Sequence, residues 1–453
     1  MTNELRTIPL SNQPTIPVAD QTDVGSYFVA NYPPFSVWSS EAVKHDAIPA
    51  LAQKPKPGVP LGLYLHIPFC RKRCHFCYFR VYTDKNSQDV GYYLDTIARE
   101  WEMYNELPAI QNRPLDFIYF GGGTPSFLST KQLKGLVTRL TNLSSWNQAQ
   151  EIAFECEPGT LTESKIALIR ELGVTRLSLG IENFDDHILE LNGRAHRSKE
   201  ISRAYTFARS VGFPQINIDL IAGMLGETEE NWRRCVEKTI ALEPDSITIY
   251  QMELPFNTTI SRDLLDGTGQ FSEPVANWTK KRQWVAEAFQ ALEQAGYSVG
   301  SAYTAVKDPS KTKFLYRDRL WQGADMAALG VASFGHLNGV HIQNLDTWET
   351  YGASIDKNKL PLSRAYKPTP EERLIRELVL QLKLGAIHPS YFLDKYHVNI
   401  LEHFSEAFES LSAEGHLNAL NADIVSLTRD GLLQVDVLLP KFFLPEHAGI
   451  RYT

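Results

Sequence analysis

Short apolar runs alternate with longer amphipathic stretches along residues 61–300. The apolar runs are rich in aliphatic and β-branched residues, which predicts buried strands. The amphipathic stretches carry apolar residues at helical spacing, which predicts helices. The predicted strands are Leu63–Ile67, Phe117–Phe120, Ile152–Cys156, Arg176–Leu179, Ile216–Ile221 and Ile247–Tyr250, and the predicted helices are Asp89–Leu107, Lys131–Thr141, Glu163–Glu171, Lys199–Ser210, Glu229–Leu242 and Trp278–Ala295.

The alternation of strand and helix predicts a parallel sheet with helices outside it. Six strand–helix units are too few for a complete eight-stranded barrel, so we expect an α/β fold, a partial (β/α)6 TIM-like barrel over residues 61–300. Folds of this kind carry their chemistry at the C-terminal ends of the strands. The motifs discussed below nearly all follow a predicted strand, so we expect one site at that end.

Three further segments flank this core. Residues 1–60 are irregular, but their aromatic residues predict an N-terminal arm that packs over the barrel. Residues 301–365 are Gly-rich and irregular, and we expect a connection that lines the cavity. Residues 366–453 predict a small α+β winged-helix-like domain. The aromatic residues of the arm are Tyr27, Phe28, Tyr32, Phe35 and Trp38, and the expected elements of the C-terminal domain are helices at Pro370–Leu382 and near Ile400–Glu414 and a hairpin of Ile424–Thr428 and Leu432–Leu439.

Composition and charge narrow the class of protein. The chain is 43% hydrophobic and 22% charged, which is ordinary for a globular protein, and its net charge is −8. An acidic balance argues against nucleic-acid binding, so we expect the C-terminal domain to act as a lid or substrate-docking element. No apolar run approaches the roughly 18 residues of a membrane span, and the polar N-terminus lacks the layout of a secretory signal. We expect a cytoplasmic protein with no membrane or nucleic-acid partner.

Three of the five cysteines lie within eight residues, Cys70, Cys74 and Cys77, directly after the first predicted strand. An odd count with this clustering is a poor disulfide framework and fits a metal or cluster site. Three thiolates can each hold one iron of a [4Fe-4S] cluster, which leaves the fourth iron open. An open iron can chelate the amino and carboxylate groups of S-adenosyl-L-methionine (SAM), and one electron then cleaves SAM to a 5′-deoxyadenosyl radical.

The other uses of the cysteines and the charges beside them also need to be considered. A zinc site completed by His66, His75 or a distant ligand stays open as the other use of the three thiols. Cys156 and Cys235 are expected to be buried thiols rather than a fourth ligand. The cations Arg71, Lys72 and Arg73 are expected to raise the reduction potential of the cluster.

The segment Tyr64-Leu-His-Ile-Pro-Phe-Cys70-x3-Cys74-x2-Cys77 resembles the oxygen-independent coproporphyrinogen III oxidase-like branch of the radical SAM superfamily. Further matching segments follow in order, and the resemblance covers roughly residues 60–440. The branch also contains haem chaperones, haem-degrading enzymes and methyltransferases or cyclopropane-forming enzymes. The further matching segments are Phe120-Gly-Gly-Gly-Thr-Pro-Ser126, Arg176-Leu-Ser-Leu-Gly180, Asn217-Ile-Asp-Leu-Ile221 and the opening of the C-terminal domain.

The resemblance implies a set of residues that bind SAM. Glu182 departs from the branch, which usually has Gln there, and a carboxylate cannot donate a hydrogen bond as an amide does. Structural roles remain open for each residue: a tight turn for the glycines, core packing for Tyr64 and a surface position for Arg194. The implied residues are Tyr64, Gly121, Gly122, Gly123, Thr124, Glu155, Glu182, Arg194 and Asp219.

Candidates for contact with the substrate are less well defined. Glu182, Tyr250 and His336 are the candidate catalytic residues, with core packing for Tyr250 and a plain loop position for His336 as alternatives. Glu157 is either a ligand-binding or a helix-capping carboxylate. Further candidates for the cavity wall are His341, Tyr303, Lys307 and Arg317.

Two departures within the branch bear on the reaction. Phe79 stands where the oxidase pattern has a fourth cysteine, and Tyr316–Trp321 lacks the His-Asn of the chaperone haem motif. We therefore expect C1 transfer, methyl or methylene, from a second SAM to an sp2 carbon of a small-molecule substrate. The alternatives are oxidative decarboxylation of a propionate-bearing porphyrinogen, anaerobic tetrapyrrole cleavage, or a haem chaperone without catalysis. We expect a flavodoxin- or ferredoxin-type electron donor as the partner.

Overall fold

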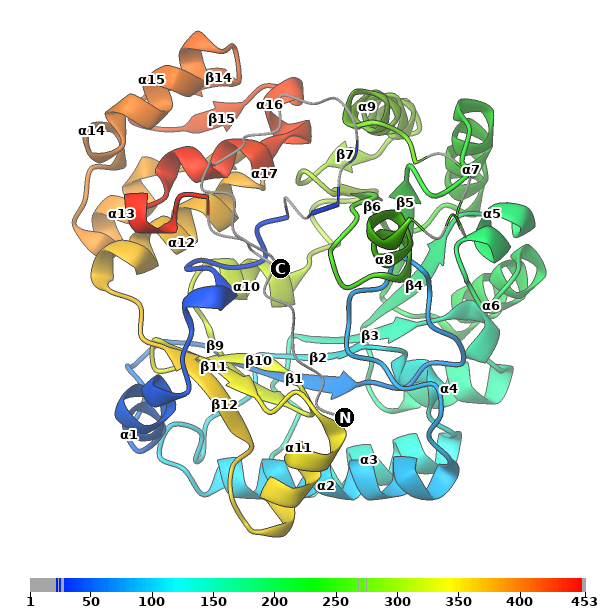
Figure 1. Cartoon of the computed structure of the whole chain (residues 1–453), viewed down its shortest axis with the longest axis vertical. Coiled ribbons are helices and arrows are strands. Elements are labelled where there is room, and N and C mark those ends of the chain that lie inside the picture. Colours follow the sequence, from blue (N-terminus) through cyan, green and yellow to red (C-terminus); the bar gives the residue numbers. More distant parts are fainter. Residues whose placement is uncertain are drawn as a thin grey trace.

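The structure is a computed structural model that describes residues 22, 24–25, 28–267, 269, 271, 273 and 275–449. Its centre is a run of six adjacent parallel strands (Figure 1). All six strands were predicted, and no boundary differs by more than three residues, which confirms the α/β fold and the partial barrel. The strands are β1 (Leu61–Ile67), β2 (Phe117–Gly122), β3 (Glu151–Cys156), β4 (Arg176–Glu182), β5 (Gln215–Ala222) and β6 (Ser246–Gln251).

Helices cover the outer side of the parallel strands (Figure 1). The predicted helices are present, and side-chain caps at Asn86 and Ser129 begin the first two of them. Two short helices at the strand ends, α5 (Asp186–Leu191) and α8 (Thr259–Asp266), were not predicted. No helix among the described residues is long and apolar enough to cross a membrane. The predicted helices are α2 (Ser87–Asn105), α3 (Thr130–Leu143), α4 (Glu163–Glu171), α6 (Ser198–Val211), α7 (Glu229–Leu242) and α9 (Trp278–Gln294).

The glycines of residues 301–365 led us to expect an irregular connection, and this was wrong. The segment instead forms strands that extend the sheet on both sides of the six central strands. One new strand pairs with β1 in parallel, and three more continue antiparallel beyond it. Another strand of the segment pairs antiparallel with β6. Gly335 lies inside one of these strands. Glycine is required there because a Cβ would be only 2.9 Å from the carbonyl oxygen of Met326 on the neighbouring strand. The elements are β7 (Ser298–Val299), β8 (Thr304–Val306), α10 (Leu315–Trp321), β9 (Asp325–Leu329), β10 (Phe334–Leu337), β11 (Val340–Asn344), α11 (Trp348–Asp356) and β12 (Leu362–Tyr366).

The described residues of the N-terminal arm contact the edge strand β12 and the segment that follows β6. Ser39 pairs with Ala365 on β12, and the amide of Gly25 donates to the carbonyl oxygen of Leu254, just after β6. Trp38 stacks on His341 with ring centroids 5.1 Å apart. The aromatic residue Tyr27 lies outside the described residues. The arm's short helices are η1 (Phe35–Val37), η2 (Val43–Ala47) and α1 (Ile48–Leu51).

The C-terminal domain packs helices on a small three-stranded sheet. Its first helix, α12 (Pro370–Leu382), has the predicted bounds, but the predicted second hairpin strand, Leu432–Leu439, is helical. Thr428 caps this helical segment by accepting from the amide of Gly431, and the apolar residues after it follow helical spacing. The remaining elements are β13 (Ala386–Ile387), α13 (Pro389–Tyr396), α14 (Ile400–His403), α15 (Ser405–Ala413), β14 (Leu417–Leu420), β15 (Val425–Leu427), α16 (Arg429–Leu433), α17 (Val435–Leu438), η5 (Leu439–Phe442) and η6 (Pro445–His447).

Candidate cluster and cofactor site

A cavity of about 480 Å³ lies at the C-terminal ends of the parallel strands. Its wall includes the three clustered cysteines, residues at the ends of β2 to β6, residues of the arm and residues of the C-terminal domain. The size lies within the range of small-molecule sites in proteins. Of the residues singled out in the sequence, the wall contains Cys70, Cys74, Cys77, Gly122, Gly123, Thr124, Glu155, Glu157, Glu182, Arg194, Asp219, Tyr250 and Tyr303.

The three cysteines lie on one loop after β1, and all three thiols are free. The amide of Cys70 donates to the carbonyl oxygen of Tyr82 at 3.1 Å, and that of Cys77 donates to Cys74 at 3.2 Å, so backbone bonds shape the loop. Burial raises the pKa of the Cys70 thiol to about 12 and that of Cys77 to about 11. The thiols of Cys70 and Cys77 therefore stay protonated until a metal displaces the protons.

The donor set fits a cluster better than a single zinc ion. No three His, Cys, Asp or Glu side chains of the described residues surround one point closely enough to hold a metal ion. A [4Fe-4S] cluster spreads its thiolates over separate iron atoms and needs no such point. The two local histidines are engaged elsewhere: His66 Nδ1 lies 3.2 Å from the Tyr64 hydroxyl, and His75 Nδ1 lies 3.1 Å from the carbonyl oxygen of Leu191.

The glycines after β2 let this turn approach the cysteine loop. A Cβ at Gly123 would lie 3.1 Å from the Sγ of Cys70 and 2.8 Å from the carbonyl carbon of Pro68. Gly122 has φ +107°, and a Cβ there would lie 2.6 Å from the ring of His66. The turn is therefore required for packing and also exposes backbone groups to the cavity. Gly121, also predicted, is not part of the wall.

Three carboxylates stand at the ends of adjacent strands. Glu155 on β3 accepts from the hydroxyl of Tyr119 at 2.6 Å, and Asp219 on β5 accepts from Ser178 at 2.8 Å. Glu182 on β4 lies between them. Burial raises the pKa of Glu155 and of Glu182 to about 7. A buried group of acids of this kind fits a cationic ligand, whose charge offsets the cost of ionising them.

Glu182 adopts a conformation that non-glycine residues avoid. Its φ is +64°, and the register of β4 against β5 shifts between Gly180 and Glu182. Such strain persists where the surrounding structure fixes the residue, and it collects at functional sites. The irregularity places the Glu182 carboxylate 3.5 Å from the guanidinium of Arg194.

Arg194 places a guanidinium in the wall of the cavity. Its Nη1 lies 3.4 Å from the Sγ of Cys74, and its Nη2 donates to the carbonyl oxygen of Gly180. Its Nε is buried and has no hydrogen-bond partner among the described residues. A guanidinium beside the cysteine loop fits an anionic group of a ligand. The chemistry of the donors therefore fits the amino-acid part of SAM beside a cluster on Cys70, Cys74 and Cys77.

Several predicted residues are not brought into the cavity. Tyr64 packs beside Tyr119, with ring centroids 6.0 Å apart, outside the wall. His336 and His341 lie on β10 and β11 with their Nδ1 atoms 3.0 Å apart, buried under the arm rather than in a loop at the cavity. Lys307 and Arg317 are likewise absent from the wall: Lys307 pairs with Glu243 at 3.0 Å, and Arg317 with Asp318 at 2.7 Å.

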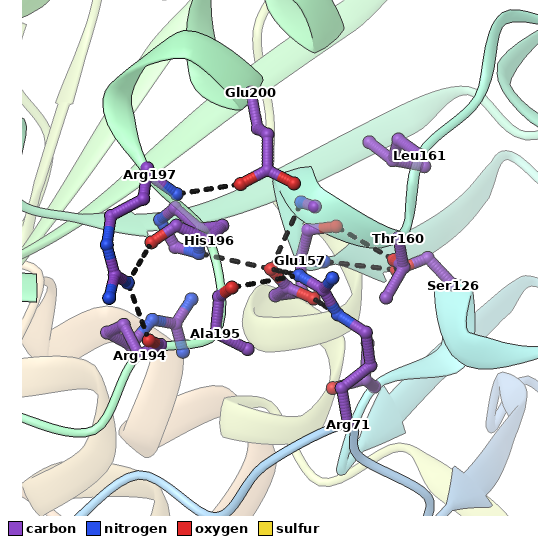
Figure 2. A network of polar contacts seen from close by, with 12 residues as sticks. Arg71, Ser126, Glu157, Thr160, Leu161, Arg194, Ala195, His196, Arg197 and Glu200 are labelled. Carbon is purple, nitrogen blue, oxygen red and sulfur yellow. Dashed lines mark hydrogen bonds and ion pairs between the residues drawn. The ribbon is translucent and has the colours of Figure 1, made fainter. Parts of the chain in front are cut away.

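Two further polar groups lie at the cavity; Glu157 was considered in the sequence as a ligand-binding or helix-capping carboxylate, and Asp436 was not predicted. Glu157 is held by Arg71 and His196 (Figure 2), and Asp436 of α17 binds the buried ammonium of Lys383 at 2.7 Å. Burial opposes ionisation of Glu157, but the contacts with His196 and Arg71 hold its pKa at about 2. The pairing of Arg71 with Glu157 offsets the charge of Arg71; that Arg71, Lys72 and Arg73 raise the reduction potential of a cluster stays a prediction. Position beside Glu155 was a weak signal for Glu157, and nothing in the sequence connected Lys383 with Asp436.

Comparison with known proteins identifies the type of site. The family description "Radical SAM superfamily" matches residues 64–238. The chain is 28% identical to the heme chaperone HemW of Bacillus subtilis over 82% of this chain and 96% of that protein. It is 28% identical to the oxygen-independent coproporphyrinogen III oxidase of Pseudomonas aeruginosa over 86% and 84% of the two chains. The structure of the coproporphyrinogen III oxidase HemN of Escherichia coli has the same fold, with a TM-score of 0.79, 24% identity and coverage of 93% and 99%.

Proposed function

Because residues 64–238 match the radical SAM superfamily, we propose that this protein is an enzyme of that type, which cleaves SAM reductively to abstract hydrogen from a small-molecule substrate. The observation that carries the proposal is the convergence of three free thiols, three buried acids and the guanidinium of Arg194 on one cavity. When bound, a [4Fe-4S] cluster and SAM supply a 5′-deoxyadenosyl radical. The protein supplies binding, orientation and exclusion of water.

The residues that would hold these cofactors follow from their chemistry. Cys70, Cys74 and Cys77 would bind iron, and Arg194 would pair with the SAM carboxylate. The acids Glu155, Glu182 and Asp219 would face the cationic and ribose parts of SAM. The backbone groups of Gly122, Gly123 and Thr124 would approach the amino group.

The remainder of the wall supports an acidic, largely apolar substrate. Tyr78 and Phe79 lie side by side with ring centroids 4.5 Å apart, and Tyr250 stacks on Tyr303 at 6.3 Å. Cationic side chains stand on the same wall, among them Lys72 and Arg73. Aromatic surfaces with cations around them suit a flat molecule that carries carboxylates.

The favoured reaction is oxidative decarboxylation of a porphyrinogen propionate. The curated relatives named above are a coproporphyrinogen III oxidase and a heme chaperone, and neither is a methyltransferase. The comparisons thus lend no support to C1 transfer, the first expectation from the sequence. In the favoured reaction a propionate side chain loses one hydrogen atom, one electron to an external acceptor and carbon dioxide, which leaves a vinyl group. Arg317 and Asp318 stand where the haem motif of the chaperones has His-Asn, and this difference argues against a function as a haem chaperone.

The test is anaerobic reconstitution with iron, sulfide, SAM, a reductant and coproporphyrinogen III. We expect stoichiometric iron and sulfide, 5′-deoxyadenosine and carbon dioxide. Formation of S-adenosylhomocysteine without carbon dioxide would replace decarboxylation by C1 transfer. Tight haem binding without SAM cleavage would make the protein a chaperone, and zinc in place of iron and sulfide would refute the whole proposal.

A further inference from the structure

The carboxylate of Glu157 forms a bidentate ion pair with Arg71, the residue that follows Cys70 (Figure 2). Arg71 Nε lies 3.1 Å from one oxygen of Glu157, and Arg71 Nη2 lies 2.9 Å from the other. Glu157 comes directly after β3, so its backbone is anchored to the sheet. Two parallel N–H···O bonds fix the orientation of both groups, which a single contact would not do.

The same carboxylate also contacts the loop that carries Arg194. His196 Nδ1 lies 3.2 Å from Glu157 Oε1, a close contact that falls short of hydrogen-bond geometry. Arg71 continues the link, because its Nη2 donates to the carbonyl oxygen of Ala195 at 3.2 Å. Arg194 reaches Cys74 from this loop. Glu157 thus lies between the loop that carries the cysteines and the loop that carries Arg194.

Glu157 is itself held on several sides. Its amide donates to the hydroxyl of Ser126 at 3.0 Å, and Ser126 follows the glycine turn after β2. The amide of Gly159 donates to Glu157 Oε1 at 3.0 Å, and Thr160 donates its hydroxyl to the Glu157 carbonyl oxygen at 2.8 Å. The carboxylate thus accepts from Gly159 and Arg71, and two further bonds hold the backbone of Glu157, so the residue is fixed and can transmit its position to the groups that it binds.

We infer that Glu157 is a positioning residue for the cluster: its carboxylate ties the cysteine loop to the loop of Arg194, so that the thiols are arranged before iron binds. Ordering a free loop on binding costs conformational entropy, and a loop fixed in advance avoids much of that cost. Glu157 acts through Arg71 and His196 and needs no contact with the cluster. The inference rests on the proposed function, since it concerns the same metal site.

Gly159 allows the ion pair to be disturbed without removal of either partner. A Cβ at Gly159 would lie 1.9 Å from Arg71 Nη2 and 2.8 Å from Glu157 Oε1. The arginine head is the end of a flexible side chain and would move away. The backbone of Gly159 is not in the left-handed region, so alanine adds no backbone strain there.

The experiment compares four proteins: wild type, Glu157→Gln, Gly159→Ala and the control Glu171→Gln, whose carboxylate forms an exposed pair with Lys134 at 3.4 Å. Each is reconstituted anaerobically, and the rate of iron loss to a chelator and the EPR spectrum of the reduced cluster are measured, with and without SAM. Changes of groups around metal ligands typically weaken binding about 10- to 100-fold, so we expect iron loss at least about tenfold faster in both site variants. We also expect broader EPR lines.

The outcomes separate the two claims. Wild-type iron retention and EPR spectra in both site variants would overturn the inference and leave the proposed function standing. Failure of the wild type itself to take up iron and sulfide would overturn both. Thermal unfolding of the metal-free proteins is measured alongside; if Glu157→Gln does not fold, Gly159→Ala alone decides, because it keeps both charged groups.

Discussion

The guanidinium of Arg194 lies 3.4 Å from the Sγ of Cys74, a contact between residues 120 positions apart in the chain. An N–H donor at a cluster sulfur stabilises the reduced, more negative state and raises the reduction potential. Arg194→Gln should therefore lower the potential, by about 40 mV if the lost bond is equivalent to about 1 kcal/mol. A redox titration followed by EPR measures this shift.

Arg194→Gln should also weaken SAM binding, because it removes the charge that pairs with the SAM carboxylate. Loss of a charge-assisted bond of about 1.5–3 kcal/mol corresponds to roughly a tenfold or greater increase in the dissociation constant. Arg139→Gln is the control, since Arg139 pairs with Asp95 on the exposed surface. An unchanged potential and unchanged SAM affinity would contradict the assigned role of Arg194.

The three clustered cysteines and Cys156 should respond differently to substitution. Cys70→Ala, Cys74→Ala or Cys77→Ala should each abolish SAM cleavage, because each removes one iron ligand. Cys156→Ala should retain the cluster and SAM cleavage, since this buried thiol needs no role beyond packing. Iron content and 5′-deoxyadenosine formation are the measurements. An inactive Cys156→Ala together with an active Cys74→Ala would show that the ligand set is wrong.

Glu182→Gln should change how stability depends on pH. Burial raises the pKa of Glu182 from 4.5 to about 7, so the folded metal-free protein keeps this proton after the unfolded chain has released it. The stabilisation from the bound proton is complete below pH 4.5 and is lost as the pH rises through 7. Relative to wild type, Glu182→Gln should therefore gain up to about 3 kcal/mol between pH 5 and pH 8.

Urea unfolding of the metal-free proteins at pH 5 and pH 8 measures this difference. Glu171→Gln, an exposed substitution, should show the wild-type dependence on pH. A Glu182→Gln variant whose stability relative to wild type is the same at both pH values would refute the raised pKa.

Asp436→Asn should destabilise the contact between the arm and the C-terminal domain. Asp436 accepts from the buried ammonium of Lys383 at 2.7 Å, from the amide of Val29 at 2.9 Å and from the hydroxyl of Tyr303. Removal of one partner of a buried ion pair costs about 3–5 kcal/mol, because the other charge is left uncompensated. Urea unfolding should show this loss, and the double variant Lys383→Met/Asp436→Leu should recover much of it. A double variant as unstable as Asp436→Asn would point to lost packing instead.

Periodicity predicted the parallel core well because each strand and helix there is long enough to show its pattern. It failed for residues 301–365, where strands such as Phe334–Leu337 are short, contain glycine and are buried on both faces. The segment Leu432–Leu439 was misassigned for a related reason: its apolar residues suit a strand or a buried helix, and the cap at Thr428 decided between them.

The sequence predicted the site residues that lie on a strand of the parallel core or directly after one. The cysteines and the carboxylates of Glu155 and Asp219 follow this rule. His336 does not line the cavity, because its loop-like surroundings in the sequence belong to an edge hairpin of the sheet. Lys383 and Asp436 pair across the C-terminal domain from positions far apart in the chain, and no local sequence pattern contains that information.

The arm pairs with β12 through Ser39 and with the segment after β6 through Gly25. It therefore connects the two sides of the incomplete barrel. Its residues Phe28 and Phe35 contribute to the wall of the cavity, whereas the thiols and acids come from the barrel. Part of the cavity wall thus comes from a segment separate from the one that carries the thiols and acids. Substitution of Phe28 or Phe35 can therefore reshape the cavity while the thiols and acids keep their places.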